Sequence, residues 1–290
     1  MRVEYQNSTR LLAVIGDPVA HSLSPLLQNT MIGEFGNDDL YLAVRVQKGG
    51  LPAFLAAARA LDFRGFNLTM PHKEDVIPFL DAMTPAARRA GSVNSVRLRE
   101  GRLEGHSTDG LGLRRALEDM ELSFRGATVT VLGAGGAARS IAMTAADSGA
   151  RQVLVINRTY AKAEALCAGE DILEAVPVED AEAVMEATDL IVNTTPVGMT
   201  GTGETGQFPF LSALKQGAAA VDCVYAPPVT PFLAEAAALG HPTANGLGML
   251  IYQAIFAYAF FRGETFNDQT VSRLGRLLGE AVERSEKNRP

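Results

Sequence analysis

Short apolar runs alternate with segments of helical apolar spacing along most of the chain. In the first part we expect strands at 11–15, 41–46 and 65–69, helices at 23–35, 49–61 and 73–80, and a hairpin formed by 93–98 and 103–105. In the second part we expect a connecting helix at 110–120, strands at 128–132, 152–156, 189–193 and 219–224, and closing helices at 247–261 and 268–286. The second set of strands is nearly all apolar, as in strands covered on both faces. The pattern therefore predicts an α/β fold with mostly parallel sheets.

Length and composition narrow the classes of protein. The 290 residues are enough for two lobes, and 47% hydrophobic with 20% charged residues indicate a soluble globular protein. A net charge of −7 argues against a nucleic-acid or anionic-membrane partner, so we expect neither. The two cysteines, Cys167 and Cys223, lie far apart, which predicts no disulfide framework and no metal site.

The location of the protein is expected from what the sequence lacks. The first ten residues carry Arg2, Glu4 and Arg10 and no apolar core of a secretion signal. The longest apolar run, 248–261, is too short to span a bilayer. We therefore expect a cytoplasmic protein, and the sequence leaves open whether it is a monomer or a homodimer.

A glycine-rich turn predicts a dinucleotide site. The strand at 128–132 runs directly into Gly133, Gly135 and Ala138, followed by an apolar helix. Gly133 permits a tight turn, Gly135 lets the backbone approach a pyrophosphate, and Ala138 is small enough for close packing of helix on strand. The helix start supplies free N–H groups and a positive dipole end for phosphates.

The residues after the next strand distinguish between two cofactors. An NAD-preferring site carries Asp or Glu there for the ribose 2′-hydroxyl. This chain has Asn157, Arg158 and Thr159, with Lys162 one turn later, so two cations can pair with a 2′-phosphate. NADP is favoured over NAD.

A polar cluster in the first lobe is not required by the hydrophobic pattern. Taken singly, Ser24 and Asp109 are explained as helix caps and Asn67 as a turn residue. The full set is Ser22, Ser24, Asn67, Thr69, Lys73, Asn94 and Asp109.

Nine segments in order give the chain a family resemblance. They are His21–Pro25, Asn67–Lys73, Gly91–Asn94, Thr108–Gly110, Gly133–Ala137, Asn157–Thr159, Asn193–Gly198, Tyr225–Pro227 and Asn245–Met249. Together they resemble the shikimate dehydrogenase family, including its quinate-using relatives, across about the whole chain.

The resemblance implies a two-lobed α/β protein. Residues 1–109 with 246–290 would form an αβα substrate-binding catalytic domain, and 110–245 a Rossmann-like NADP-binding domain. The implied reaction is the reversible NADPH-dependent reduction of 3-dehydroshikimate to shikimate, an oxidoreductase step of aromatic amino acid biosynthesis.

The resemblance also implies roles for individual residues. Lys73 and Asp109 would be the catalytic pair. Ser22 and Ser24 would hold the substrate carboxylate, with Tyr225 near it. The other substrate-binding residues would be Asn67, Thr69, Asn94 and Gln253, with Asp109 also on a ring hydroxyl. The cofactor-binding residues would be Gly133, Ala134, Gly135, Gly136, Ala137, Asn157, Arg158, Thr159, Lys162, Cys223 and Gly246.

The chemistry of ketone reduction agrees with the catalytic pair. Hydride delivery builds alkoxide charge on oxygen, which needs a nearby proton donor or cation, and a lysine facing an aspartate supplies both. Three positions depart from the family pattern: Ser107 replaces a usual Asn, Ser95 a frequent Thr, and Cys223 a Met of some relatives. Of these, Ser107 has the clearest consequence, because a shorter side chain could shift Asp109.

Two other functions remain open from the sequence. One is a paralogue acting on quinate or an amino analogue of shikimate; Ser24, where quinate users tend to carry Thr, favours shikimate. The other is a non-catalytic metabolite sensor, which would not need both Lys73 and Asp109. His72 and His106 are expected to have surface or packing roles.

Overall fold

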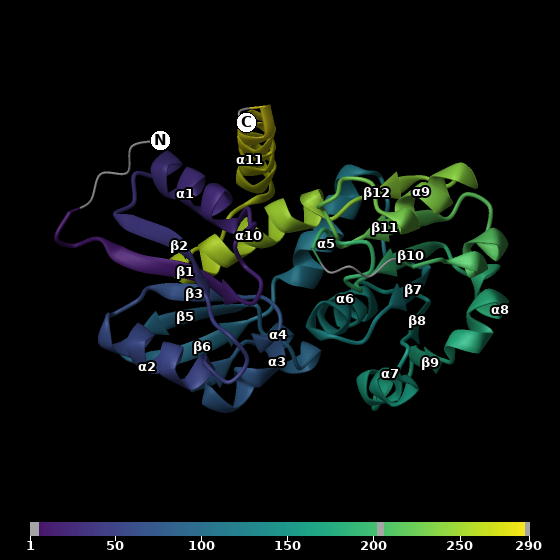
Figure 1. Cartoon of the computed structure of the whole chain (residues 1–290), viewed down its shortest axis with the longest axis horizontal. Coiled ribbons are helices and arrows are strands. Elements are labelled where there is room, and N and C mark those ends of the chain that lie inside the picture. The colour runs from purple at the N-terminus through teal and green to yellow at the C-terminus, as the bar shows by residue number, and fades with distance from the viewer. Residues whose placement is uncertain (1–5, 202–205, 288–290) are drawn as a thin grey trace. The chain divides into compact units, whose positions relative to one another are not determined.

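The computed structural model describes residues 6–201 and 206–287, which form two compact units (Figure 1). Unit 1 combines the chain up to Thr108 with the chain from Ile251 onward, and unit 2 spans Asp109–Leu250. Arg2 and Glu4 of the amino-terminal segment considered above lie outside the described residues. From the sequence, the domain boundaries were expected after residues 109 and 245, whereas the two units meet after residues 108 and 250.

Unit 1 is built on a six-stranded mixed sheet with the order β2-β1-β3-β5-β6-β4. Its strands are β1 (Arg10–Gly16), β2 (Asp39–Arg45), β3 (Gly65–Leu68), β4 (Ala82–Met83), β5 (Ser95–Arg99) and β6 (Arg102–His106). Strands β1, β2 and β3 are parallel, and the hairpin expected from Glu100 and Gly101 joins β5 to β6 in antiparallel pairing. The mostly parallel arrangement therefore changes direction at β5.

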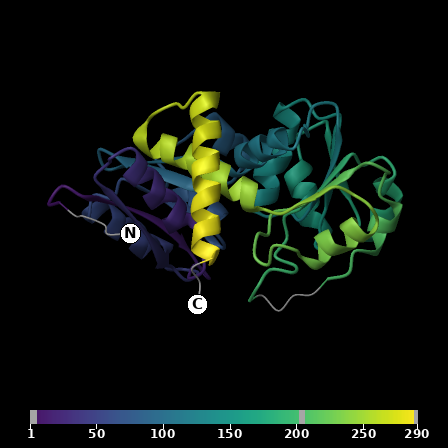
Figure 2. The same ribbon diagram turned by 90° about the horizontal axis from the view of Figure 1, so that it is seen from above.

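The helices of unit 1 cover both faces of this sheet. They are α1 (Ser24–Glu34), α2 (Leu51–Ala60), α3 (His72–Asp75), α4 (Pro85–Ala90), α10 (Leu247–Arg262, which begins in unit 2) and α11 (Asp268–Lys287), with a 3-10 turn η1 (Ile77–Phe79). Residues of α2, such as Leu51 and Leu55, pack with Ala13, Ile15 and Phe66 of the sheet into one core. Helix α11 packs beside α1, so the end of the chain returns to its beginning (Figures 1 and 2).

Unit 2 is a six-stranded parallel sheet with the order β12-β11-β10-β7-β8-β9. Its strands are β7 (Thr128–Leu132), β8 (Gln152–Ile156), β9 (Leu173–Val176), β10 (Leu190–Asn193), β11 (Ala219–Asp222) and β12 (Thr243–Ala244). The order reverses between β7 and β10, as in doubly wound dinucleotide-binding sheets. The α/β class and the Rossmann-like half expected from the sequence are confirmed.

Helices cover both faces of the second sheet. They are α5 (Asp109–Asp119), α6 (Gly136–Asp147), α7 (Tyr160–Cys167), α8 (Ala181–Met185) and α9 (Pro231–Ala238), with 3-10 turns η2 (Val178–Asp180) and η3 (Pro209–Ala213). Helices α5, α6 and α7 share one core with the sheet, while α8, η3 and α9 share the other. The strands pack on both sides, which explains why their sequences are nearly all apolar.

One expected element is wrong in its details. A single helix was expected from 73 to 80, whereas α3 ends at Asp75 and is followed by the separate turn η1. Pro78 lies in this segment, has no N–H for a helical hydrogen bond and clashes with the preceding turn. The strands β4, β9 and β12 and the helices α4, α7, α8 and α9 were not given ranges from the sequence, since two to eight residues carry too little periodicity to be seen.

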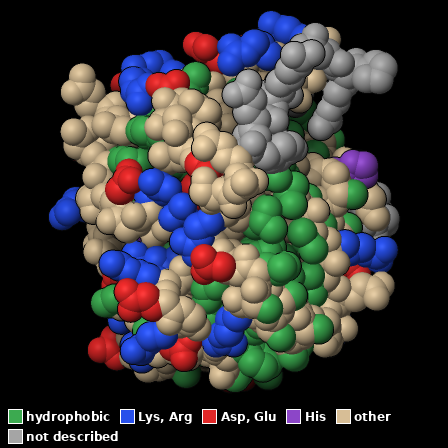
Figure 3. Space-filling view, turned by 90° about the vertical axis from the view of Figure 1, so that its left-hand side faces the viewer, with side chains coloured by type: hydrophobic (Ala, Val, Ile, Leu, Met, Phe, Trp, Pro, Cys, Tyr) green, Lys and Arg blue, Asp and Glu red, His purple; other side chains and the backbone are tan. Residues whose placement is uncertain are grey.

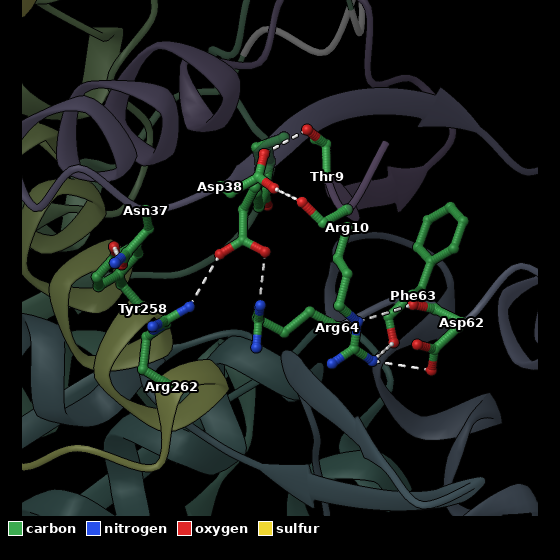
Figure 4. A network of polar contacts seen from close by, with 12 residues as sticks. Thr9, Arg10, Asn37, Asp38, Asp62, Phe63, Arg64, Tyr258 and Arg262 are labelled. Carbon is green, nitrogen blue, oxygen red and sulfur yellow. Dashed lines mark hydrogen bonds and ion pairs between the residues drawn. The ribbon is translucent and has the colours of Figure 1, made fainter. Parts of the chain in front are cut away.

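Two arginines bind one buried carboxylate and so connect the carboxyl-terminal part of unit 1 to its sheet. Asp39 is fully buried and accepts from Arg64 Nε (2.6 Å) and from Arg262 at the end of α10 (3.1 Å). Figure 4 shows Arg64 and Arg262 converging from two directions, with the Tyr258 hydroxyl donating to Asn37 beside them. This network joins residues more than two hundred positions apart in the sequence.

Apolar side chains also reach the surface of unit 1. Figure 3 shows them gathered in a band on one face, and the large exposed apolar residues of this unit include Leu42 (39% exposed) in the edge strand β2 and Leu61 (64%) after α2. The edge of β2 is partly occupied, because the Asn29 amide of α1 donates to the Tyr41 carbonyl (2.8 Å) and accepts from the Tyr41 N–H (3.0 Å). The Asn29 side chain thus occupies the Tyr41 N–H and carbonyl groups, which an added strand would need for pairing.

The described residues contain neither a membrane-spanning helix nor a cluster of metal ligands. In the segments 6–201 and 206–287, no helix combines the length and the hydropathy needed to cross a bilayer. The same residues contain no group of three His, Cys, Asp or Glu side chains placed to hold a metal ion.

Candidate functional site

Gly133 forms the sharp turn at the end of β7. Its φ of 108° lies in the left-handed region that favours glycine, and its N–H donates to the Ile156 carbonyl of β8 (2.8 Å). A Cβ atom at this position would lie 2.6 Å from Thr194 Oγ1, so a side chain has no room. The turn therefore sits between β7, β8 and the residue after β10, at the point where the strand order reverses.

Gly135 has a different reason to be glycine. Its φ of −86° is open to any residue, and a Cβ built there meets no atom within 4 Å. It is the N-cap of the 12-residue helix α6 and makes no side-chain cap, so the N–H groups of the first turn, which includes Gly136 and Ala137, need other acceptors. Ala134 and Ala138 are buried, the latter completely. Open space over a helix N-terminus at a switch point fits a dinucleotide pyrophosphate.

The segment after β8 presents two cations. Asn157 is partly buried, and its Nδ2 donates to the Thr159 carbonyl (2.8 Å), which fixes the bend before α7. Arg158, Thr159 and Lys162 are exposed. The Arg158 and Lys162 side chains are thus available to an anionic group at the carboxyl end of β8.

A buried hydrogen-bond network joins the ends of β10 and β11. Asn193 and Asp222 are paired across the two strands, and Asn193 Nδ2 donates to Asp222 Oδ1 (3.1 Å). Asp222 also accepts from the Val224 N–H (2.9 Å) and from Thr230 Oγ1 (2.6 Å). Burial raises the pKa of Asp222, while these three donors oppose the change. Neither Asp222 nor Thr230 was expected from the sequence, because an Asp at a strand end carries no distinctive signal.

Two residues expected at the cofactor lie next to this network. The Cys223 N–H donates to the Asn193 carbonyl (2.8 Å), and Cys223 is partly buried. Gly246 packs directly on it, because a Cβ at Gly246 would lie 2.1 Å from the Cys223 carbonyl oxygen. The N–H of Gly246 donates to the Val224 carbonyl (3.0 Å), so Gly246 fixes the backbone that carries Cys223.

In unit 1, Asn67 is the centre of a buried polar group. Both protons of its amide are used: Nδ2 donates to the Asn94 carbonyl (3.0 Å) and to Ser95 Oγ (2.9 Å). Its Oδ1 accepts from the Tyr41 hydroxyl (2.7 Å). Tyr41 was missed by the sequence analysis, because a tyrosine in an alternating strand reads as an ordinary core residue.

Asn94 and Gln253 come together although they are far apart in the sequence. Asn94 Nδ2 donates to Gln253 Oε1 (3.4 Å) and to Thr108 Oγ1 (2.9 Å), and its Oδ1 accepts from the Thr108 N–H (2.9 Å). All three residues are nine-tenths or more buried. Gln253 lies on α10, so the fold of unit 1 brings the final helices to the same polar group as the first hundred residues.

Ser22 and Ser24 lie at the start of α1. Ser22 Oγ accepts from the Ser24 N–H (3.2 Å), and Ser24 is the first residue of the helix; the N-cap is Leu23. Burial raises the pKa of Tyr41 well above its usual range, and a hydrogen bond from the Ser24 hydroxyl opposes this. Ser24 therefore lies beside the Tyr41–Asn67 pair.

Thr69 and Lys73 follow the end of β3 and are partly buried. The Thr69 N–H donates to the Ile15 carbonyl (2.9 Å), and the Thr69 carbonyl accepts from the His72 N–H (3.0 Å). The carbonyl of Lys73 accepts from the Val93 N–H (2.9 Å), which places α3 next to the residue before Asn94. Unit 1 thus gathers Ser24, Asn67, Asn94 and Gln253 in one polar group, with Thr69 and Lys73 on the adjoining backbone.

Asp109 and Tyr225 belong to unit 2. Asp109 is the first residue of α5 and is 4% exposed, and the next residue, Gly110, donates from its N–H to Ser140 Oγ of α6 (2.9 Å). A Cβ at Gly110 would lie 2.0 Å from Thr144 Oγ1, so α5 and α6 are in close contact there. Tyr225 is partly buried. Because Lys73 and Asp109 lie in different units, their pairing stays a prediction, as does the approach of Tyr225 to the substrate carboxylate.

The two histidines left without a role are packing residues. His72 is fully buried and its Nε2 lies 2.7 Å from the Val46 carbonyl oxygen. His106 bonds Thr84 Oγ1 through Nδ1 (2.8 Å), and its ring lies 4.9 Å from that of Phe260.

Comparison with known proteins decides the family. The pattern described as "Shikimate dehydrogenase substrate binding domain" matches residues 14–96, and that described as "Shikimate / quinate 5-dehydrogenase" matches 115–204. A protein of Moorella thermoacetica named shikimate dehydrogenase (NADP(+)) is 39% identical over 287 residues, which cover 97% of this chain and 96% of the relative. The chain belongs to the shikimate dehydrogenase family.

Further members of the family agree with this assignment. A protein of Citrifermentans bemidjiense with the same name is 44% identical, with 88% of this chain and 90% of the relative covered. Among solved structures, shikimate 5-dehydrogenase of Thermus thermophilus, crystallised with NADP(H) and shikimate, is 37% identical and superposes with a TM-score of 0.80 over 94% of this chain and 99% of the other. The family resemblance stated from the motifs is confirmed.

Proposed function

We propose that this protein is an NADP-dependent shikimate dehydrogenase that reduces 3-dehydroshikimate reversibly to shikimate. The observation that carries the proposal is that a single chain holds an open glycine turn at a strand-order switch and a buried polar group in its other unit. Relatives that match both units over nearly their whole length are named for this activity. The ligands in the Thermus thermophilus structure, NADP(H) and shikimate, are of the two kinds that these two features suit.

The substrate-binding roles follow the chemistry of unit 1. Both protons of Asn67 are used within the protein, so toward a ligand Asn67 offers only its Oδ1 as an acceptor. An acceptor suits a substrate hydroxyl, and Thr69, Asn94 and Gln253 supply further groups for ring hydroxyls. Ser22 and Ser24 hold the substrate carboxylate with their hydroxyl protons, and Tyr225 lies near it. Neutral donors suffice for this anion in a chain of net charge −7.

The catalytic roles are assigned to Lys73 and Asp109. Bound NADPH supplies the hydride for the carbonyl carbon. The Lys73 ammonium donates the proton that the developing alkoxide needs, and the Asp109 carboxylate holds that ammonium and a neighbouring substrate hydroxyl. Both side chains are partly or largely buried, so water competes weakly with these contacts.

The cofactor preference rests on Arg158 and Lys162. Two exposed cations at the end of β8 pair with a 2′-phosphate, which NAD lacks. We expect Arg158→Ala to raise the KM for NADP by about tenfold or more and to leave the KM for NAD nearly unchanged, as for a lost charge-assisted hydrogen bond. Steady-state kinetics with both cofactors measure this difference. Equal effects on both cofactors would discredit the 2′-phosphate contact.

The proposal is tested by a two-by-two assay of the purified protein. Shikimate and quinate are each offered with NADP and NAD, and reduced nicotinamide is followed at about 340 nm, its absorption band in any such enzyme. Turnover is expected to be highest with shikimate and NADP. Preference for quinate would identify a quinate-using paralogue, and the absence of turnover in all four mixtures would favour a metabolite sensor.

A further inference from the structure

Asp222 is an unusual residue in unit 2. Its side chain is fully buried, and in the described part of the chain its partners are the Asn193 amide, the Val224 N–H and the Thr230 hydroxyl, with no lysine, arginine or histidine among them. A buried carboxylate without a cation is costly, because three neutral hydrogen bonds replace water but do not cancel the charge. No ion pair in the described residues therefore compensates a charge on Asp222.

Three hydrogen bonds stabilise the charged form of the Asp222 carboxyl against the effect of burial, which raises its pKa. The Val224 N–H and the Asn193 amide nitrogen both donate to Oδ1, so this oxygen accepts two hydrogen bonds. The Thr230 hydroxyl donates to the other oxygen, Oδ2 (2.6 Å). Thr230 in turn accepts from the Leu233 N–H as the cap of α9, which turns its own proton toward Asp222.

The position of this charge relates it to the proposed cofactor. In a doubly wound sheet a dinucleotide lies across the carboxyl ends of the strands at the switch point, with one half on each side. Here Gly133, Arg158 and Lys162 lie on the β7–β8 side, which suits the phosphates and the adenosine half. The nicotinamide half would then lie toward the ends of β10 and β11, where Asp222 is the last residue of β11.

We propose that Asp222 is an electrostatic determinant of cofactor redox state, whose buried negative charge favours the oxidised nicotinamide over the reduced one. The inference rests on the proposed NADP-dependent function. The oxidised ring carries a positive charge and the reduced ring is neutral, whereas the rest of the cofactor is the same in both forms. A fixed negative charge nearby therefore lowers the free energy of the oxidised form selectively and assists hydride donation to the ketone.

Asp222→Asn is the direct test, because it removes the charge and keeps the shape. The new amide oxygen can accept from Asn193 and Val224, and the new NH2 group can donate to the Thr230 hydroxyl, which rotates to accept. The dissociation constants of NADP+ and NADPH are measured separately on the full chain, by calorimetry and by the fluorescence of NADPH, without substrate. We expect the ratio of the NADP+ constant to the NADPH constant to rise about tenfold, the scale of one charge acting through a partly screened interior.

Two control variants separate charge from packing. Thr230→Ser removes a buried methyl group and keeps the hydroxyl that donates to the carboxylate, and Glu182→Gln removes an equal charge from an exposed position on α8. Both are expected to leave the ratio unchanged. If Asp222→Asn does not fold, Asp222→Ser is used, since serine keeps an acceptor for the Val224 N–H.

The outcomes distinguish this inference from the function on which it rests. If the two constants change by the same factor in Asp222→Asn, or if Thr230→Ser shifts the ratio as much, the carboxylate acts only through packing and the inference is overturned. If the unmodified protein binds neither form of the cofactor, the proposed function itself is overturned.

Discussion

Tyr41 and Asp222 were absent from the expected site although each lies at the centre of a buried network. A tyrosine in an alternating strand and an aspartate at a strand end are common in proteins, so their local sequence carries no mark of a function. Ser24, Asn67 and Asn94 were predicted because they stand in a recognisable order of motifs. A functional side chain can thus be predicted from the sequence when it belongs to a motif. A side chain that only holds a motif residue in place is identified from the structure.

Lys73 is the residue on which turnover is expected to depend. Lys73→Ala keeps the backbone carbonyl that accepts from Val93, so the variant should fold and bind NADPH. Loss of the proton donor is expected to lower kcat by about 10²–10⁴-fold. Steady-state assays of 3-dehydroshikimate reduction measure this, with Lys48→Ala, an exposed lysine of the same unit, as the control. A near-normal rate for Lys73→Ala would remove it from the mechanism.

His106 is expected to make the stability of the protein depend on pH. Desolvation lowers the pKa of His106 to about 4 from a usual 6.5, with Glu104 opposing and Arg97 assisting the change. The folded state therefore holds a neutral ring while the unfolded state takes up a proton below pH 6.5, so stability is lost as the pH falls from about 6.5 to 4. The loss should reach about 3 kcal/mol, at 1.36 kcal/mol for each unit.

Urea unfolding at several pH values measures the contribution of His106. In His106→Gln the free energy of unfolding should fall less steeply between pH 6.5 and 4, because the replacement does not titrate. An unchanged pH dependence in this variant would contradict the prediction.

Helices and strands with strong periodicity were predicted well, and the exceptions have local causes. The strands of both sheets that run for four or more residues were expected, apart from β9, and the closing helices α10 and α11 match the expected ranges closely. The helix expected after Lys73 is interrupted near Pro78, since proline cannot continue the hydrogen-bond ladder. The order of the strands was not accessible, because pairing depends on contacts between distant segments.

Substitution of Gly135 at the start of α6 and of Gly246 before α10 is expected to have different effects on stability and on NADP affinity. Gly135→Ala adds a methyl group in open space at an ordinary φ, so the free energy of unfolding should change by less than about 1 kcal/mol. NADP should nevertheless bind at least about tenfold more weakly, because the methyl group occupies the proposed path of the pyrophosphate.

Gly246→Ala provides the contrasting case. Its methyl group would lie 2.1 Å from the Cys223 carbonyl oxygen, a backbone atom that cannot rotate away. We expect a loss of about 3 kcal/mol or more in stability. Thermal unfolding and NADP titration of both variants measure the pair; comparable stability losses in the two would show that Gly135 is also a packing residue.

Unit 1 as a body depends on segments from both ends of the chain. Asp39, the first residue of β2, binds Arg64 and Arg262. Helix α11 packs beside α1 (Figure 1). Asp39→Asn leaves two arginines without their carboxylate in a largely buried setting. We expect a loss of about 2–4 kcal/mol from the stability of unit 1, since breaking a buried pair strands the remaining charge.

Differential scanning calorimetry tests the role of Asp39. The control is Asp62→Asn, which removes an exposed pair with Arg10 and places asparagine at a positive φ that it tolerates. That control should cost less than about 1 kcal/mol. Equal losses of stability in the two variants would mean that Asp39 contributes no more than a surface pair.

Saturation with NADP should raise the unfolding temperature of unit 2, since a ligand stabilises the body that binds it.

By itself, the sequence determined the α/β class, the principal helices and strands, the glycine turn and the family. These depend on periodicity and on motifs, which are local or follow one another in order. Only the tertiary structure decided the strand order that creates the switch point, the meeting of Asn94 with Gln253, and the burial of Asp222 without a cation. Each of these is set by packing between segments that are distant in the sequence. The free energy of that packing depends on the whole core, so no single stretch of residues determines it.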